Sequence, residues 1–400
     1  MILKGNLLYG QSGGPTSVIN SSAYYLFEEA FKHVDRIENI YAMHYGLEGL
    51  LEEDLILIKN NKELKKLINT PGSYFGSNRF KLDYQDKETF IKILNIFKKY
   101  NIRYFFYNGG NDSMDSITKL NDFFKENNYE CYSIGIPKTI DNDLSYCDHT
   151  LGYPTAAKFI ANSVSEIFYD DNSYKTGRVN IIEVMGRNAG WLAASSLLAN
   201  LTGAHVDLIY VPESIFSIDK FLEDVKKIYS KKHHCLVVVS EGIKDKSGRF
   251  VFETNAKADA FNHVQLGGVG LILANLVNRK LNFKVRAIEL SLLQRASTIS
   301  LSKEDVKECK KVSKYALKLA LNNKSGYMIT INRVSSSPYK IKLKYVDLHN
   351  VSNIERTLPL EYINKEKNYI SSSFIDYCLP LIEGNINSFK DNGLIDFYND

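Results

Sequence analysis

Short apolar runs recur along the chain, and glycine-rich turns follow them before helical patterns begin. The clearest runs are Leu7–Tyr9, Tyr104–Tyr107, Val179–Val184 and Leu236–Val239. Runs of this length, bounded by glycine, are typical of buried strands. Their alternation with helical stretches predicts an α/β protein with parallel sheets. Ligands of such sheets bind beyond the carboxyl ends of the strands, where these glycine-rich turns are expected to lie.

The last part of the chain has a different pattern. Residues 326–345 alternate apolar and polar positions, which predicts a hairpin or an edge pair of strands. The 400 residues are enough for two or three domains. We expect an N-terminal α/β domain over residues 1–150, to which the chain returns near 290–330, and a second α/β domain over 151–290. Residues 331–400 are expected to form a C-terminal segment that packs on the second domain.

Composition narrows the class of protein. The chain has 50 Lys and Arg residues against 46 Asp and Glu residues, and this small positive excess predicts neither nucleic-acid nor membrane binding. The five cysteines are scattered without a CxxC pair, so neither a zinc site nor a disulfide framework is indicated, and a reducing cytoplasm fits best. The N-terminal apolar run is too short for a signal peptide, and no stretch approaches the ~20 apolar residues of a membrane span.

Two glycine-rich segments open helices and are candidate phosphate-binding loops. In Gly10–Thr16, two adjacent glycines would let the backbone approach an anion at a helix N-terminus, although a plain tight turn explains the pattern equally well. In Gly109–Ser116, Asn111 and Asp112 stand at the first helical turn. Such side chains serve either as helix caps or as groups beside a metal-bound phosphate chain.

Further segments carry charged side chains. Pro137–Asp143 holds two carboxylates, a hydroxyl and a lysine, so it is either a loop that supplies a general base or an Asx-rich turn. In Glu183–Arg187, an arginine at the carboxyl end of a strand can face a transferring phosphoryl group or pair with an acid. Ser240–Gly242 and Arg286–Arg295 add a glutamate and two arginines, which either clamp a sugar phosphate or lie on the surface.

Together, these segments resemble the phosphofructokinase family. The matching strings stand in the family's order and close to its spacing, over nearly the whole chain from Gly5 to about Pro338. They are Gly13–Gly14, Gly109–Gly110, Thr139–Asp143, Met185–Arg187, Glu241–Gly242 and Gln294–Arg295. The resemblance implies two Rossmann-like α/β domains with the active site in the cleft between them. It also implies phosphoryl transfer to the 1-hydroxyl of fructose 6-phosphate, with the donor on the first domain and the sugar phosphate on the second.

The resemblance assigns roles residue by residue. Asp141 matches the base that deprotonates the sugar hydroxyl, and Arg187 would balance charge on the phosphoryl group in flight. Arg178 and Arg286 match arginines that reach the 6-phosphate from a neighbouring subunit, so a homo-oligomer, either a dimer or a tetramer, is expected. The other matches to substrate-binding residues are Thr139, Asp143, Met185, Gly186, Glu241 and Arg295. The matches to residues that bind the phosphate chain are Gly13, Gly14, Arg79, Lys81, Gly110 and Ser113.

Two positions bear on the identity of the phosphoryl donor. Asp112 replaces a glycine of ATP-using members and puts a carboxylate where the α-phosphate of the nucleotide would lie. Lys138 also stands where those members have glycine, and it can stabilise the free phosphate that leaves diphosphate. Both substitutions match the diphosphate-dependent branch of the family. Mg²⁺ is the implied cofactor, and Asn111 is the candidate metal ligand.

Two other hypotheses stay open. An ATP-dependent enzyme would keep the fold and the base but conflicts with Asp112 and Lys138. A non-catalytic member that senses sugar phosphates conflicts with the presence of Asp141. Leu292 and the pair Ala296–Ser297 depart from the family's sugar-binding pattern, which leaves room for use of a related sugar phosphate such as a seven-carbon one.

Overall fold

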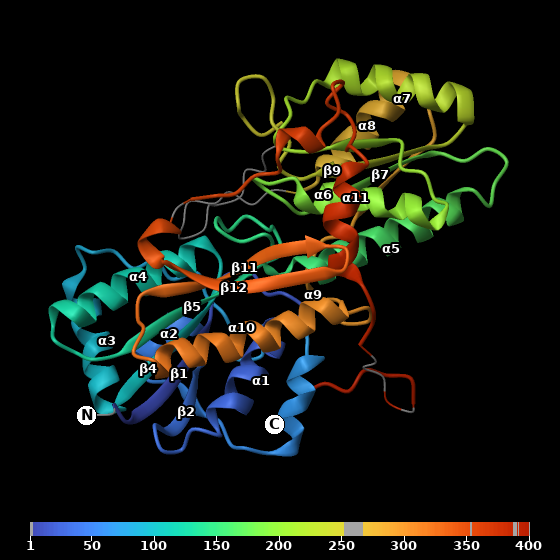
Figure 1. The fold of residues 1–400 in the computed structure, drawn as a ribbon. Helices are drawn as coiled ribbons and strands as arrows, with labels where there is room; N and C mark the ends of the chain where they lie inside the picture. The colour runs from blue at the N-terminus through green and yellow to red at the C-terminus, as the bar shows by residue number, and fades with distance from the viewer. Residues whose placement is uncertain (1–2, 252–266, 353, 387–389, 391, 400) are drawn as a thin grey trace.

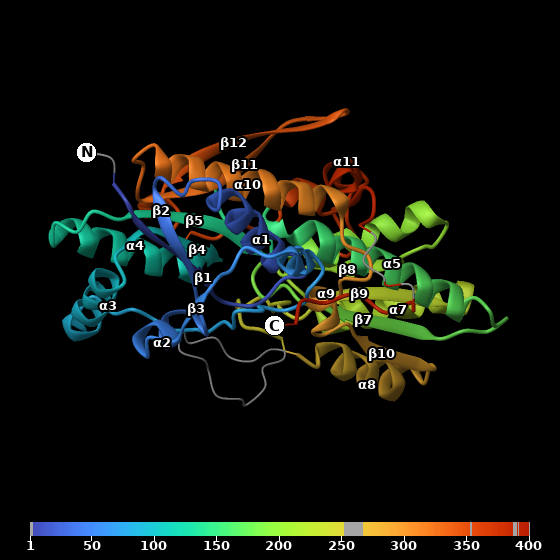
Figure 2. The ribbon, with the colours of Figure 1, turned by 90° about the horizontal axis from the view of Figure 1, so that it is seen from below.

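The computed structural model describes residues 3–251, 267–352, 354–386, 390 and 392–399. Two α/β domains lie side by side, and each is built on its own sheet with helices on both faces (Figures 1 and 2). The fold class predicted from the sequence, two Rossmann-like domains with parallel sheets, is confirmed. Among the described residues, no helix is both long enough and apolar enough to cross a membrane.

The first sheet has β1 (Gly5–Gln11) near its centre. The full strand order is β12 (Tyr339–Asp347), β11 (Tyr327–Ser336), β5 (Tyr132–Thr139), β4 (Ile102–Gly109), β1, β2 (Ile37–Met43) and β3 (Leu55–Leu57), with β6 (Leu151–Gly152) paired to the end of β5. The central strands run parallel, whereas β3 and β12 run antiparallel to their neighbours at the two edges. Every residue of β1 is buried, because helices cover both faces of a parallel sheet, and this explains the apolar run seen in the sequence.

Two layers of helices cover the first sheet. One layer contains α1 (Ile19–Ala30), η1 (Lys62–Ile68) and α10 (Lys303–Leu321), and the other contains α2 (Gly46–Leu51), α3 (Lys87–Lys99) and α4 (Asn111–Glu126). α10 lies against α1 although they are far apart in the sequence: the Ser313 hydroxyl donates to the Ser22 carbonyl at 2.9 Å, across 291 positions. A helix from late in the chain therefore completes the N-terminal domain.

The second sheet is entirely parallel. Its strand order is β10 (Val285–Glu289), β7 (Val179–Val184), β9 (Cys235–Ser240) and β8 (Leu208–Tyr210). One face is covered by α7 (Ile218–Lys232) and α8 (Val269–Leu281), and the other by α5 (Tyr153–Asp171), α6 (Trp191–Ser195), η2 (Ser196–Thr202) and α11 (Ser373–Cys378). The long helix α5 runs from the first domain into the second (Figure 1). The short helix α9 (Leu293–Ala296) follows β10 and leads back to the first domain.

The C-terminal part of the chain divides between the two domains. The hairpin expected over residues 326–345 is confirmed, but β11 pairs in parallel with β5 and so extends the first sheet. The prediction that all of residues 331–400 pack on the second domain is therefore wrong for this hairpin. The reason is that Met328, Ile329 and Ile331 are fully buried, which a strand achieves by joining a sheet already covered on both faces.

The chain then crosses to the second domain and returns. Past η3 (Leu348–Asn350), Leu358, Phe374 and Leu381 pack in the core beneath α6, together with η4 (Leu360–Tyr362) and η5 (Leu379–Ile382). The chain finally reaches the first domain again at Tyr398, whose ring centroid lies 4.9 Å from that of Tyr74. The C-terminal segment is thus an interdomain connection rather than an appendage of one domain.

Candidate active site

A cleft of about 580 Å³ lies between the domains, at the carboxyl ends of β1, β4, β5, β7 and β9. This is where ligands of open α/β sheets bind. The sequence-predicted residues that line it are Gly13, Gly14, Arg79, Gly110, Asn111, Asp112, Ser113, Lys138, Thr139, Asp141, Asp143, Met185, Arg187, Glu241 and Arg295. Gly186 lies beside them, and its N–H donates to the Glu241 carboxylate at 3.4 Å.

Three predicted residues lie away from this cleft. Lys81 is exposed in the segment that precedes α3. Arg178 precedes β7, so it stands at the amino end of a strand whose carboxyl end borders the cleft, roughly 20 Å away along the strand. Its guanidinium Nε donates to Asp171 Oδ1 at 3.2 Å. Arg286 is exposed on the edge strand β10. A single chain therefore does not bring these three side chains to the cleft.

The glycine loop after β1 and the end of β5 are joined through Lys138. The Lys138 ammonium donates to the carbonyls of Ser12 at 2.8 Å and Gly14 at 2.7 Å. Burial lowers the pKa of Lys138 to about 7, and the positive charges of Arg295 and Arg79 act in the same direction. The carboxylates of Asp141 and Asp143 act in the opposite direction but do not outweigh burial, and a phosphate anion bound in the cleft would add negative charge beside the ammonium.

The loop after β5 places two carboxylates in the cleft. Burial, followed by the charges of Glu241 and Glu355, raises the pKa of Asp141 to about 6. Burial, followed by the charges of Asp141 and Glu355, raises the pKa of Asp143 to about 7. A carboxylate with a pKa near 6 can accept a proton at neutral pH more readily than an ordinary aspartate, which suits a general base.

Asn111 and Asp143 form a candidate site for a hard cation. The Asn111 amide donates to Asp143 Oδ2 at 3.3 Å. The Oδ1 atoms of both residues are buried and have no hydrogen-bond partner. Carboxylate and amide oxygens are the ligands that Mg²⁺ takes in proteins. Among the described residues, no group of three His, Cys, Asp or Glu side chains forms a complete metal site. Mg²⁺ here would need ligands from the substrate as well, as it does at many phosphate sites.

Backbone close to Glu241 forms the second-domain wall of the cleft. Burial raises the pKa of Glu241 to about 7. A Cβ atom on Gly242 would lie 1.9 Å from the Arg187 carbonyl oxygen, so only glycine allows these two loops to meet. The Met185 N–H donates to Gln294 at 3.0 Å. The Arg295 guanidinium lies close to the glycine loop of the first domain: a Cβ atom added to Gly14 would be only 3.1 Å from it. This arginine therefore spans the two halves of the site.

Sequence reasoning missed several residues that line the cleft. Among them are Asn188, next to the predicted Arg187, and Glu355, which lies beyond the hairpin. The Asn188 amide donates to Glu355 at 3.0 Å, and Glu355 forms an antiparallel bridge with Leu144. Asn188 was within reach of motif reasoning because it directly follows Met185–Arg187. Glu355 lies in no motif, and no local pattern in the sequence signals its return to the cleft.

Phosphoryl transfer requires accurate positioning and neutralisation of phosphate charge more than covalent chemistry by the protein. The cleft offers a glycine loop, several cations and a carboxylate with a raised pKa, and together with the fold this defines a phosphotransferase. The chain belongs to the phosphofructokinase family, whose sequence model matches residues 6–307.

Named relatives narrow the class further. The chain is 38% identical to a pyrophosphate–fructose 6-phosphate 1-phosphotransferase of Methylococcus capsulatus, over 95% of this chain and 92% of the relative. It is 39% identical to the protein of that name from Xanthomonas campestris, with the same coverage of both chains. Among solved structures, the pyrophosphate-dependent phosphofructokinase of Nitrosospira multiformis superposes with a TM-score of 0.89 at 35% identity, over 98% of this chain and 96% of that one.

Proposed function

We propose that this chain transfers a phosphoryl group reversibly between diphosphate and the 1-hydroxyl of fructose 6-phosphate. The products of the forward reaction are fructose 1,6-bisphosphate and phosphate, and the reaction belongs to glycolysis. The observation that carries the proposal is the presence of Asp112 and Lys138 together in the first-domain half of the cleft. Asp112 opposes the α-phosphate of a nucleotide by like charge, and Lys138 favours a free phosphate leaving group.

The mechanism follows from the positions of the charged groups. Asp141 accepts the proton of the 1-hydroxyl while the 1-oxygen of the sugar forms a bond to the terminal phosphorus of diphosphate. The bond from that phosphorus to the bridging oxygen breaks, and the electron pair leaves with the free phosphate beside Lys138 and the Gly13–Gly14 loop. Arg187 and Arg295 neutralise charge on the phosphoryl group and on the sugar phosphate. Glu241, with its raised pKa, accepts a hydrogen bond from a sugar hydroxyl.

Mg²⁺ fits this site, and Asn111 with Asp143 would hold it through their unpartnered oxygens. When bound, the ion supplies charge neutralisation for the phosphate chain. The amide of Asn111 is neutral, so of these two ligands only the Asp143 carboxylate can carry negative charge, and diphosphate would supply the rest.

The quaternary structure is part of the proposal. Arg178 and Arg286 lie outside the chain's own cleft, and we assign them to the 6-phosphate of a neighbouring subunit in a homo-oligomer. Sedimentation of a fully active monomer would refute this assignment. We place the enzyme in the cytoplasm, and the five cysteines, all buried and unpaired, support a reducing compartment.

A donor assay on the purified protein tests the proposal. Fructose 6-phosphate and Mg²⁺ are supplied with diphosphate or with ATP, and formation of the 1,6-bisphosphate is followed. Product with diphosphate alone is expected. Product with ATP alone would keep the fold and the base but overturn the roles of Asp112 and Lys138. Product with neither donor would shift the assignment to another sugar phosphate or to a sensor.

A further inference from the structure

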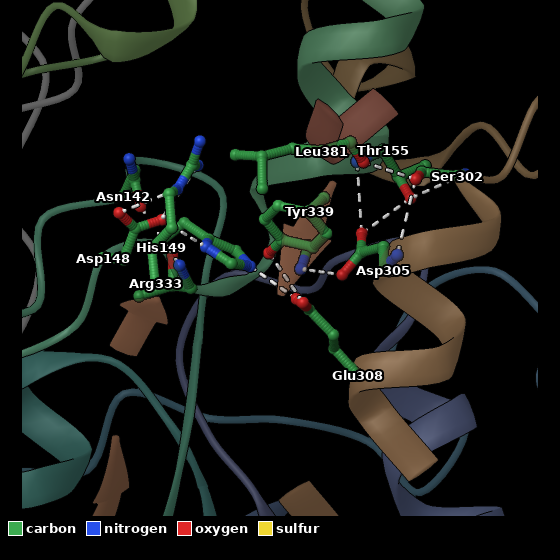
Figure 3. Close-up of polar contacts among 12 residues, drawn as sticks. Asn142, Asp148, His149, Thr155, Ser302, Asp305, Glu308, Arg333, Tyr339 and Leu381 are labelled. Atoms are coloured by element: carbon green, nitrogen blue, oxygen red, sulfur yellow. Dashed lines mark hydrogen bonds and ion pairs between the residues drawn. The ribbon is translucent and has the colours of Figure 1, made fainter. Parts of the chain in front are cut away.

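A buried cluster of charged side chains lies directly behind the loop that carries Asp141. We call residues 139–150 the catalytic loop. His149, in this loop, is fully buried between two carboxylates: Nδ1 donates to Asp148 Oδ2 at 2.9 Å, and Nε2 donates to Glu308 of α10. Figure 3 shows the two contacts on opposite sides of the imidazole ring.

Two more side chains complete the cluster from the C-terminal hairpin. Arg333 of β11 contacts both carboxylate oxygens of Asp148, at 3.0 to 3.2 Å. The Tyr339 hydroxyl, from β12, donates to Glu308 Oε1 at 2.7 Å. Charge balances here when His149 is protonated, because two carboxylates then face one imidazolium and one guanidinium. Burial alone would lower the pKa of His149, but the charges and hydrogen bonds of Glu308 and Asp148 raise it to about 9.

The cluster reaches Asp141 through one tyrosine and one asparagine. The Tyr377 hydroxyl of α11 donates to the Asp148 carbonyl at 2.7 Å and accepts from the Asn142 amide at 2.8 Å. Asn142 is fully buried, follows Asp141 directly and has a left-handed backbone with φ of 57°. Its Oδ1 accepts from the Thr150 N–H at 3.0 Å, which closes the base of the loop. Asp148 therefore links His149, through its carboxylate, to Tyr377 and Asn142, through its backbone carbonyl, and Asn142 is the neighbour of the candidate base.

The same helix also fixes the segment that follows the loop. Asp305 lies three residues before Glu308 on α10 and accepts from the Gly152 and Thr155 N–H groups at 3.0 and 3.1 Å, where α5 begins (Figure 3). Residues three apart on a helix share a face. α10 therefore holds the catalytic loop through Glu308 and the start of α5 through Asp305, and it anchors both to the first domain.

We propose that His149, Glu308 and Tyr377 are positioning residues, which hold the catalytic loop so that Asp141 meets the sugar hydroxyl. None of the three lines the cleft. Glu308 and Tyr377 also lie beyond residue 307, where the family match ends. The inference rests on the proposed function for its kinetic effect. Its structural content, an ordered loop, does not depend on which reaction the cleft performs.

The kinetic test compares variants that disturb the cluster without touching the cleft. His149→Gln and Tyr377→Phe are each expected to lower kcat about tenfold or more, because small misplacements of a catalytic group are costly. KM for both substrates should stay within about twofold. Tyr377→Phe keeps the ring that packs against Trp191 at 5.1 Å, so it remains usable if His149→Gln does not fold. Since both changes act along one path, the double variant should lose less than the product of the two single effects.

A rescue variant separates positioning from general damage. His149→Gln leaves Glu308 buried without its counter-charge, whereas His149→Gln/Glu308→Gln replaces the ion pair with two amides and is expected to recover most of kcat. His349→Gln is the matched control. His349 also lies between two carboxylates, Asp347 at 2.7 Å and Asp122 at 2.8 Å. Its side chain, however, is 54% exposed, and neither carboxylate belongs to the His149 cluster. Its kcat should equal that of the wild type.

Hydrogen exchange provides a readout that needs no turnover. Amides of residues 139–150 are expected to exchange at least about tenfold faster in Tyr377→Phe than in the wild type, while amides of β1 keep their protection. Unchanged loop exchange would overturn the positioning role whatever the enzyme's substrate is. Wild-type inactivity in the donor assay, together with faster loop exchange in the variant, would instead overturn the proposed function and leave the loop assignment standing. A variant whose kcat falls while its KM for the substrates rises by a similar factor would also overturn the proposal, because the defect would then lie in substrate binding as well.

Discussion

The ion pair of His149 makes a quantitative prediction about stability and pH. The pKa of His149 is about 9 in the folded protein, because Glu308 and Asp148 outweigh the effect of burial, and its ordinary value is 6.5. The difference of 9 − 6.5, multiplied by about 1.36 kcal/mol per pKa unit, corresponds to about 3 kcal/mol. Because the folded state holds the proton more tightly, this stabilisation is complete below pH 6.5 and is lost as the pH rises through 9.

The reference protein for this measurement is the double variant His149→Gln/Glu308→Gln. The single variant would leave Glu308 buried without a counter-charge, and its titration would add a second pH dependence. Urea unfolding at about pH 6, 7.5 and 9.5 can be followed by the fluorescence of Trp191, the sole tryptophan, which packs against Tyr377. The wild type should lose about 3 kcal/mol relative to the double variant between the lowest and the highest pH.

A pH-independent difference between wild type and double variant would refute this reasoning. It would mean that His149 is not protonated in the folded state at neutral pH, and that the cluster is held by neutral hydrogen bonds. His349→Gln sets the scale for an exposed histidine between carboxylates. Since that side chain is 54% exposed, its removal should cost less than about 1 kcal/mol at any pH.

Three predictions concern the active site itself. Asp141→Ser should lower turnover at least ~10²-fold while calorimetry still detects fructose 6-phosphate binding, and near-normal turnover would disprove the role of base. Asp112→Gly should admit ATP to the cleft, measured by nucleotide titration; if no nucleotide binds, the obstacle is not this carboxylate. The acid limb of kcat/KM should lie near pH 6, because burial, then Glu241 and Glu355, raise the pKa of Asp141. Glu355→Gln removes one like charge and should move that limb to lower pH, whereas an unmoved limb would exclude Glu355 as a neighbour that matters.

The parts of the site that could be predicted from the sequence are those formed by contiguous residues at strand ends. Gly13, Gly110 and Asp141 each lie within two residues of the end of a buried strand, and the geometry of a parallel sheet brings such positions together at one edge. Local sequence therefore contains enough information to place them. The resemblance to a family added their roles, and the cleft brings these predicted residues together.

The parts that could not be predicted depend on long-range packing. Glu355 reaches the cleft through an isolated bridge to Leu144, and Tyr377 reaches Asn142 across 235 positions. Neither residue lies in a pattern that distinguishes it from a surface or a core residue. The pairing of β11 with β5 was missed for the same reason: alternation predicts a hairpin but not the sheet that it joins.

The late return of α10 to the first domain has a consequence for synthesis of the protein. The contact between Ser22 of α1 and Ser313 of α10 spans 291 residues. Because ribosomes add about 5–20 residues per second, α10 is synthesised about 15–60 s after the part of α1 that it covers. During that time the nascent N-terminal domain exposes the side of α1 that faces α10, which carries Ser22 and the ring of Tyr25; in the finished fold that ring centroid lies 5.4 Å from the Lys310 ammonium of α10. Emergence of residues 303–347 is thus the event that covers this surface of the first domain, whereas the core of the second domain still requires residues 358–381.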